Sequence, residues 1–228
     1  ANRAVQFTPA TQEKLTAYEI GARLGFWGHR AQVNVTCFYY DYTDKQFSSY
    51  VSDPTFGALQ RLVNIPKSRA WGIDGEIVLQ PINELTLTWN ATYLDTKVKN
   101  YTGANAAGIP TDFSGANFSF APKFSTSGTA LVVVPVSTNF DFRASLNASY
   151  QSKTHSDFGE DPLFAIKDYF LLNGSIGVQS ADGNWGLSLW ARNLTNTYYW
   201  TSVVDNQNLN VRFAGMPRTY GLTLSYGF

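Results

Sequence analysis

The stretch Phe140-Asp141-Phe142-Arg143-Ala144-Ser145-Leu146-Asn147-Ala148-Ser149-Tyr150-Gln151 alternates two kinds of side chain without a break. Even positions carry Phe, Ala, Leu or Tyr, and odd positions carry Asp, Arg, Ser, Asn or Gln. A period of two predicts a β-strand with one apolar and one polar face. The strand is about twice the usual length in soluble sheets, but it matches the ~9–11 residues of a tilted membrane strand.

The same alternation recurs along the chain and predicts nine strands. In the stretch 185–193 only Trp190 departs from it, as an apolar residue on the polar side. No segment shows convincing helical periodicity, so we predict an all-β protein. The predicted strands are 14–27, 31–42, 70–80, 85–95, 124–135, 140–151, 169–180, 185–194 and 211–228.

The connections between these strands alternate strictly in length. Short connections at 28–30, 81–84, 136–139 and 181–184 are followed by long ones at 43–69, 96–123, 152–168 and 195–210. This places every short turn at one end of the sheet and every long loop at the other. Such sorting is typical of an antiparallel up-and-down transmembrane β-barrel. Aromatic residues gather at strand ends, which fits either interfacial girdles or simple strand propensity.

The composition excludes several other classes of protein. The 17 Lys and Arg balance 17 Asp and Glu, so no cationic excess favours nucleic acid. Charged residues make up 15%, mean hydropathy is −0.19, and no apolar run approaches the ~20 residues of a spanning helix. The single cysteine, Cys37, excludes a disulfide-stapled fold. Its parity predicts that it faces lipid.

An odd number of strands bears on how the barrel closes. An up-and-down sheet of nine strands would bring its first and last strands together in parallel, whereas single-chain bacterial barrels have even counts. Open strand edges are not tolerated in a bilayer. We therefore expect the nine strands to form part of a larger barrel. The chain begins with neither Met nor a signal peptide, which fits a mature product or an internal fragment.

Five local patterns, in order along the chain, resemble the C-terminal barrel region of TonB-dependent outer-membrane receptors. The departures from the family patterns are Asp74 for Glu, and Thr195 and Asn196 for Phe-Asp. The patterns are Tyr39-Tyr40-Asp41-Tyr42-Thr43-Asp44-Lys45-Gln46, Trp71-Gly72-Ile73-Asp74-Gly75-Glu76, Ala121-Pro122-Lys123, Asn193-Leu194-Thr195-Asn196-Thr197-Tyr198-Tyr199, and Pro217-Arg218-Thr219-Tyr220-Gly221 through Phe228.

This resemblance carries expectations about the whole protein. Residues 1–228 would be the C-terminal portion of a 22-stranded barrel, without the plug domain and the N-terminal strands. The protein would lie in the outer membrane of a Gram-negative bacterium and import a scarce siderophore, vitamin or glycan, energised by TonB. The C-terminus would be periplasmic and the long loops extracellular. Expected partners are membrane lipid, lipopolysaccharide, the plug, the remaining barrel strands, TonB and the barrel-assembly machinery; no enzyme activity, cofactor, metal or nucleic acid is expected.

Three groups of residues are candidates for these roles. The first shares the inward, polar parity, which suits contact with a plug or a hydrated lumen: Glu19, Arg23, Asp74, Glu76, Arg143 and Arg192. The second lies in the long loops, where it could stack on a ligand, pack the loops together or lie near lipopolysaccharide: Phe47, Tyr50, Tyr101, Phe158, Trp200 and Asn206. The third resembles an assembly signal: Tyr220, Leu222, Leu224, Tyr226 and Phe228.

Particular residues also suggest other functions. His155-Ser156-Asp157 holds the residue types of a hydrolase triad, but neighbours in one loop cannot converge as nucleophile, base and orienter. His155 with Asp157, Glu160 and Asp161 could bind a cation or be a solvated acidic loop. The alternatives to a receptor are a passive porin, a barrel that displays a passenger domain, or a secreted carbohydrate-binding β-protein.

Overall fold

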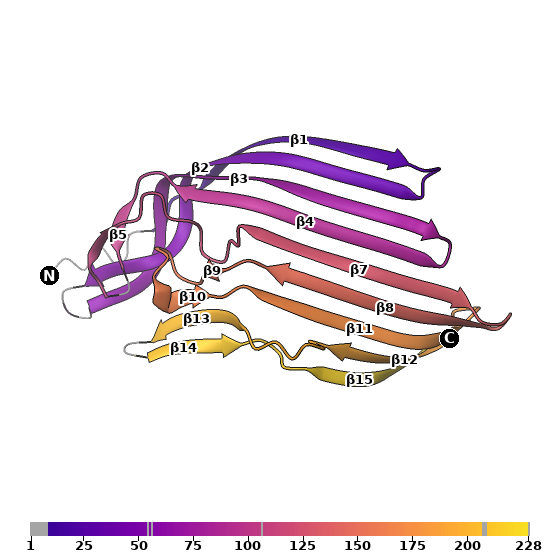
Figure 1. Cartoon of the computed structure of the whole chain (residues 1–228). Helices are drawn as coiled ribbons and strands as arrows, with labels where there is room; N and C mark the ends of the chain where they lie inside the picture. The colour runs from indigo at the N-terminus through magenta and orange to yellow at the C-terminus, as the bar shows by residue number, and fades with distance from the viewer. Residues whose placement is uncertain (1–8, 54, 56, 106, 207–208, 228) are drawn as a thin grey trace.

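Nine long antiparallel strands form one curved sheet in the computed structural model, which describes residues 9–227 except 54, 56, 106, 207 and 208 (Figure 1). Each strand pairs with the next long strand along the chain, as an up-and-down meander requires. The long strands are β1 (Lys14–Phe26), β2 (Ala31–Asp53), β3 (Gly57–Ile82), β4 (Leu85–Val98), β7 (Phe124–Pro135), β8 (Phe140–Gln151), β11 (Tyr169–Ser180), β12 (Trp185–Arg192) and β15 (Thr219–Tyr226).

The register places apolar side chains on one face of the sheet and polar ones on the other. In one row across β7, β8, β11, β12 and β15, Val132 lies opposite Ala144, which is followed by Ile176, Leu189 and Leu222. The next row on the other face holds Leu131, then Ser145, Ser175, Trp190 and Gly221. The predicted alternation therefore becomes two chemically different surfaces.

Aromatic residues form bands at both ends of the apolar face. Toward the long loops, Trp71 and Tyr93 have ring centroids 5.6 Å apart, and Phe124 and Tyr150 lie 6.3 Å apart. Toward the short turns, Phe140 and Trp185 have ring centroids 5.4 Å apart. This arrangement is that of the interfacial girdles on a membrane barrel. Cys37 is exposed on the same face, opposite Ile20 and Ile73.

The predicted loop 43–69 is wrong: most of it is a hairpin. β2 and β3 continue their ladder from Thr43↔Lys67 to Asp53↔Gly57, far beyond the rest of the sheet. The extension is supported because Val63 and Ile65 are buried and Ile65 packs with Val98, Phe113 and Phe158 from other segments at this end. Local alternation could not reveal that tertiary support.

The predicted last strand, 211–228, is also wrong as one element. It is divided into β14 (Leu209–Ala214) and β15, and β14 pairs instead with β13 (Trp200–Asn206), inside the predicted loop 195–210. The break coincides with Gly215, against which the Tyr199 ring packs closely, and with Pro217, which has no N–H to donate to a ladder. The four short turns lie where the spacing predicts, the second reduced to Asn83 and Glu84.

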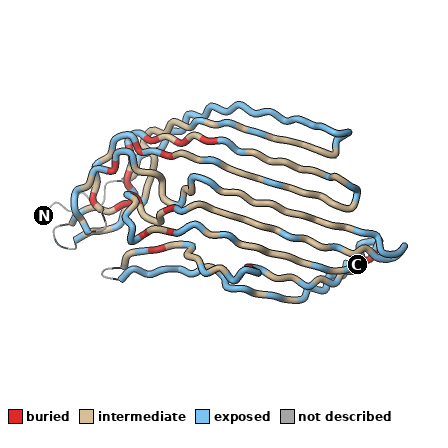
Figure 2. Tube along the Cα trace, in the orientation of Figure 1, coloured by how far each residue is buried: buried red, intermediate tan, exposed pale blue. Residues whose placement is uncertain are grey.

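The sheet is not closed within the described residues, since β1 pairs only with β2 and β15 only with β12. Among the same residues, no helix is long and apolar enough to cross a membrane. Figure 2 shows buried residues concentrated at the loop end of the sheet. The short elements there are β5 (Thr102–Ala104), β6 (Pro110–Asp112), β9 (Thr154–His155), the 3₁₀ helix η2 (Pro162–Phe164) and β10 (Ala165–Ile166).

Candidate functional site: the polar face and the loops above it

Ionisable side chains on the polar face are tied together by hydrogen bonds across strands. Arg23 Nε donates to Asn34 Oδ1 over 3.0 Å, and Asn34 Nδ2 donates to Glu76 Oε1 over 2.7 Å, which joins β1, β2 and β3. Thr92 Oγ1 donates to Asp74 Oδ1 over 2.7 Å. These residues lie in register on one face. The face is therefore wettable and charged, unlike the apolar face behind it.

The other three predicted inward residues lie on this same face. Tyr40 OH donates to a Glu19 carboxylate oxygen over 2.5 Å. Arg143 donates to the Gln179 side-chain oxygen. The Arg192 guanidinium lies 5.4 Å from the centroid of the Trp190 ring. All six residues are thus placed on one surface, and each has a polar or aromatic neighbour there.

Asparagines on the same face form a second network that reaches the loop end. Asn147 Nδ2 donates to Thr129 Oγ1 over 3.0 Å, and Asn173 Nδ2 donates to Asn147 Oδ1 over 3.2 Å. Asn173 Oδ1 in turn accepts the backbone N–H of Asn193 over 3.0 Å. The ladder joins β7, β8 and β11 to the start of the last long loop.

Above the sheet, several loops share a hydrophobic centre, the loop core of Ile65, Val98, Phe113 and Phe158. Phe47 and Tyr101, two of the predicted ligand residues, pack against it. Phe158, a third, is only 7% exposed, and its ring centroid lies 4.9 Å from that of Phe113. Phe158 is therefore not available to a ligand in this arrangement. The loop core fastens the β2–β3 hairpin to the loops 99–123 and 152–168.

Tyr50 and Trp200 lie in other surroundings. Burial raises the pKa of the Tyr50 hydroxyl, and the negative charges of Asp205 and Asp157 raise it further. Trp200 packs against a second buried cluster that contains Phe164, Ile166 and Val203, while its ring lies 5.2 Å from the Arg212 guanidinium carbon. The side chain of Asn206 and the whole of Phe228 lie outside the described residues.

A polar cavity of about 320 Å³ lies between the segments 117–123 and 152–160. Lys123 and Lys153 line it, and within the described residues neither forms an ion pair. They flank the hydrogen bonds between Phe124 and Ser152 that extend the β7–β8 pairing. The cavity was missed by sequence reasoning. The sequence signal for it was Lys123 immediately before the predicted strand 124–135 and Lys153 just after the neighbouring predicted strand 140–151.

Carboxylates complete the lining of this polar cavity. Glu160 Oε1 accepts hydrogen bonds from the backbone N–H and side-chain amide of Asn117. Burial raises the pKa of the Asp157 carboxyl to about 6; the charges of Asp161 and Glu160 add to the rise, and backbone N–H groups oppose it. Asp157 Oδ1 has no hydrogen-bond partner. No group of three or more His, Cys, Asp or Glu in the described part of the chain could hold a metal ion.

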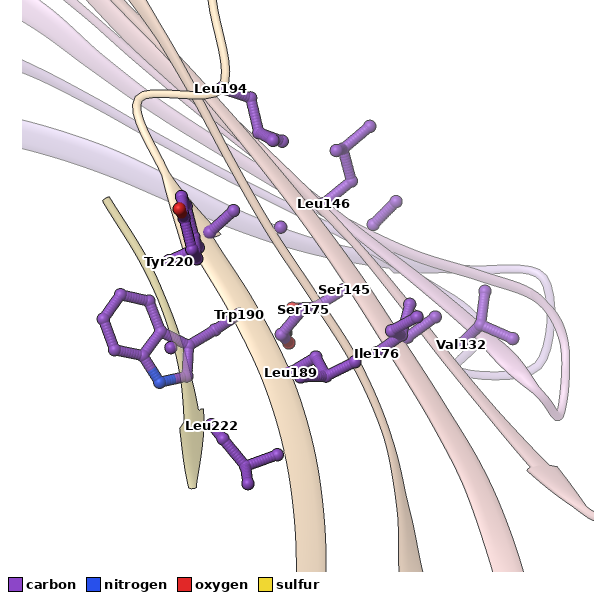
Figure 3. Close-up of a pocket in the computed structure, with 15 residues that line it drawn as sticks. Val132, Ser145, Leu146, Ser175, Ile176, Leu189, Trp190, Leu194, Tyr220 and Leu222 are labelled. Carbon is purple, nitrogen blue, oxygen red and sulfur yellow. Dashed lines mark hydrogen bonds between the residues drawn. The ribbon is translucent and has the colours of Figure 1, made fainter. Parts of the chain in front are cut away.

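A larger hollow, about 870 Å³, lies on the apolar face and is open to the outside of the sheet. Figure 3 shows Leu146, Ile176 and Leu189 on one side of the strands, whereas Trp190 projects from the other. Small residues at Ala130, Ala144 and Gly174 create the depression between the larger side chains. Its lining is almost wholly apolar, so it suits the hydrocarbon of a bilayer and not a polar solute.

The chain is similar to a known family and to several solved structures. The family model described as the β-barrel of TonB-dependent receptor-like proteins matches residues 3–194. The ferric yersiniabactin uptake receptor FyuA of Yersinia pestis has a similar fold, with a TM-score of 0.73 and 20% identity over 92% of this chain and 29% of its own. The siderophore receptor PiuA of Acinetobacter baumannii gives 0.69 and 18% over 93% and 28%. BauA, the ferric preacinetobactin receptor of the same species, gives 0.66 and 21% over 94% and 29%.

These findings establish the class of the protein. The chain belongs to the TonB-dependent receptor-like β-barrel family, which is one of transport receptors and not of enzymes. It spans less than a third of the length of the receptors that it matches. The predicted antiparallel barrel fold, as part of a larger barrel, is confirmed.

Proposed function

We propose that this chain is part of the wall of an outer-membrane receptor that takes up a ferric siderophore, with energy delivered through TonB. The family match over most of the chain is the observation that carries the proposal. Similar folds in receptors described as siderophore receptors favour that ligand class over a vitamin or glycan.

The two faces of the sheet support a barrel with a hydrated interior. The apolar face with its aromatic bands suits lipid, and the polar face suits water or a plug domain packed inside. Glu19, Arg23, Asp74, Glu76, Arg143 and Arg192 are proposed contacts for that plug or for lumen water. The unpaired edges of β1 and β15 would join the remaining barrel strands, because free edges are not tolerated in hydrocarbon.

The polar cavity is the proposed place where this part of the barrel contacts the ligand. Lys123 and Lys153 could hold an anionic donor group of an iron chelate, because their ammonium groups form no ion pair in the part of the chain that the structure describes. Tyr50 and Trp200 remain proposed contacts from neighbouring loops. Phe47, Tyr101 and Phe158 are better explained as the packing that holds these loops in place.

Orientation and assembly follow from the same proposal. Short turns would lie in the periplasm and the long loops outside the cell. The chain would then end in the periplasm, after a strand whose Tyr220, Leu222, Leu224 and Tyr226 lie on the apolar face. Together with Phe228 these residues would be read by the barrel-assembly machinery. Surface labelling of a tag inserted at 207–208 tests the orientation, since only an extracellular loop reacts in intact cells.

Uptake by the full-length protein tests the function. The protein is produced from its complete gene in a Gram-negative strain that lacks its own siderophore receptors, and labelled iron is supplied with a panel of siderophores. We expect one or more complexes to accumulate only when TonB is present. Accumulation without TonB would support a passive porin, and no accumulation of iron, vitamin or oligosaccharide would support an anchor barrel.

The polar cavity is tested in the same assay by Lys123→Gln together with Lys153→Gln. Loss of an anion contact should raise the ligand concentration needed for half-maximal uptake while leaving the amount of assembled receptor unchanged. The matched control is Lys167→Gln with Arg218→Gln, which removes two exposed cations at the same end of the sheet. An unchanged half-maximal concentration in the first pair would remove Lys123 and Lys153 from the site.

A further inference from the structure

Four cations form a block on the apolar side of the sheet, just beyond the aromatic band at the loop end. Arg69 and Lys97 lie directly opposite each other on β3 and β4, and the next outward pair along the ladder is Lys67 with Lys99. We call Lys67, Arg69, Lys97 and Lys99 the basic block. Trp71, in the aromatic band, lies on the same face next to Arg69, on the side toward the short turns.

Burial confirms that these side chains point away from the barrel interior. Along β3, Ser68 and Ala70 are buried, whereas Lys67 is exposed. Along β4 and just after it, Thr96 and Val98 are buried, whereas Lys97 and Lys99 are exposed. The residues between the cations thus face the loop core, and the cations face outward. The basic block would lie where the headgroups of a membrane begin.

The protein neutralises only two of the four cations of the basic block. Asp95 lies 3.6 Å from Arg69 and also accepts the indole N–H of Trp71 over 3.0 Å. Asp41 lies 3.4 Å from Lys99. Lys67 and Lys97 form no ion pair within the described residues, and Lys14 on β1, opposite Thr43, lies two strands from Lys67 on the same face. Like charges directly opposite each other destabilise a strand pair, so an anion bound between them would relieve a real repulsion.

We propose that the basic block binds a phosphate group of a phosphorylated glycolipid in the outer leaflet. The inference rests on the outer-membrane location given under the proposed function. Backbone positions on neighbouring strands are about 4.8 Å apart and those two residues along a strand are about 7 Å apart, so long cationic side chains from these positions can reach one phosphate together. The Trp71 and Tyr93 rings set the depth, because such rings lie at the interface where lipid headgroups meet hydrocarbon. A soluble ligand has no reason to bind on this outer face.

The test measures lipid on the full-length receptor purified from outer membranes in mild detergent. The probes are lipid A with two phosphates and the same lipid after enzymatic dephosphorylation, with retention read by native mass spectrometry. We expect the phosphorylated lipid to be retained, in a manner that weakens with salt, and the dephosphorylated lipid to be lost. Lys67→Gln with Lys97→Gln should lower retention roughly tenfold, and Lys67→Arg with Lys97→Arg should keep it.

The control for net charge is Lys167→Gln with Arg218→Gln, which should retain the lipid as the native chain does. Equal retention of the two lipids by the native chain would overturn the proposal, even if the substituted receptors assemble poorly. Retention of anionic phospholipid vesicles but not of lipid A would overturn it too, because the basic block would then face the other leaflet. If the native receptor retained lipid A but took up no iron, the result would count against the proposed function alone.

Discussion

Trp190 lies across Gly221 on the polar face of the last hairpin. A Cβ atom at position 221 would stand 2.5 Å from Cζ2 of the indole, which is closer than side chains tolerate. The indole N–H donates to Thr223 Oγ1 over 3.1 Å, and the Arg192 guanidinium lies against the ring. The apolar residue that breaks the alternation of the stretch 185–193 therefore has its own partners, and the glycine opposite makes room for it.

Gly221→Ala is expected to displace Trp190 and to break its hydrogen bond to Thr223. Overpacking of this kind costs about 1–3 kcal/mol. Folding of the full-length receptor into lipid, followed by heat-modifiable mobility, measures the loss. Gly75→Ala is the control, because a Cβ there would meet no atom closer than 3.9 Å. Equal losses for the two variants would show that strand glycines matter only through backbone flexibility.

The two faces of β12 should differ in how much stability a new charge costs. Leu187 lies between Val178 and Leu224 on the apolar face, and Ser188 lies beside it on the polar face. Leu187→Arg should cost ~2–4 kcal/mol near the middle of the membrane, whereas Ser188→Arg should cost much less. Refolding into lipid bilayers gives both values. Similar costs would contradict the assignment of the faces.

The equivalent comparison in β8 is less clean than its alternation implies. Leu146 is exposed on the apolar face, so Leu146→Arg should again be costly. Asn147, however, bonds both Thr129 and Asn173, so a substitution there also breaks the ladder. Ser188 is thus the better polar-face position for the test.

Asn193 is expected to be the most sensitive polar residue at the loop end. It is 4% exposed; its Oδ1 accepts the Thr197 N–H over 2.8 Å, and its Nδ2 donates to the carbonyls of Thr197 and Met216. Asn193→Ala leaves these buried groups unpaired, at about 1–3 kcal/mol for each group that finds no water. Denaturant unfolding from lipid measures the change.

Asn193→Gly separates the two causes of that loss. Asn193 has φ of 50°, a left-handed conformation that alanine adopts poorly and glycine adopts freely. If the hydrogen bonds dominate, the glycine variant should be nearly as unstable as the alanine variant. Recovery of most of the stability with glycine would assign the effect to the backbone.

The strand faces could be predicted from sequence because the two-residue period is a local property. Phe140 to Gln151 needs no partner to show which residues share a face, and even the place of Arg143 and Arg192 on the polar face follows from parity. The basic block could not be predicted in this way. Lys67 and Lys99 are far apart in sequence, and only the register between β3 and β4 brings them together.

The loops escaped prediction for a related reason. Phe158 is buried because it meets Phe47 and Phe113 from distant segments, with ring centroids 5.1 and 4.9 Å away. A solitary aromatic in a polar loop looks the same in sequence whether it packs inward or awaits a ligand. The hairpin extension of β2 and β3 depends on the same contacts through Ile65. Both the burial of Phe158 and the length of the β2–β3 hairpin depend on packing between distant segments, which produces no periodic pattern in the sequence.

The packing of loop 152–168 should tighten as the pH falls. The pKa of Asp157 is about 6 in the folded chain, against an ordinary value of 3.8, because burial disfavours its charged form. Between these values the folded state binds more protons than the unfolded state, so the loop gains stability as the pH is lowered from 7 to 5, with no further gain below about 3.8. Hydrogen exchange of amides 152–168, corrected for intrinsic rates, measures this in the full-length receptor.

Asp157→Asn should give strong protection at pH 7 and remove this part of the pH dependence. Asp112→Asn should leave it intact, because a hydrogen bond with Ser114 lowers the pKa of Asp112. Protection that weakens from pH 7 to 5, or that changes equally in both variants, would show that Asp157 does not control the loop.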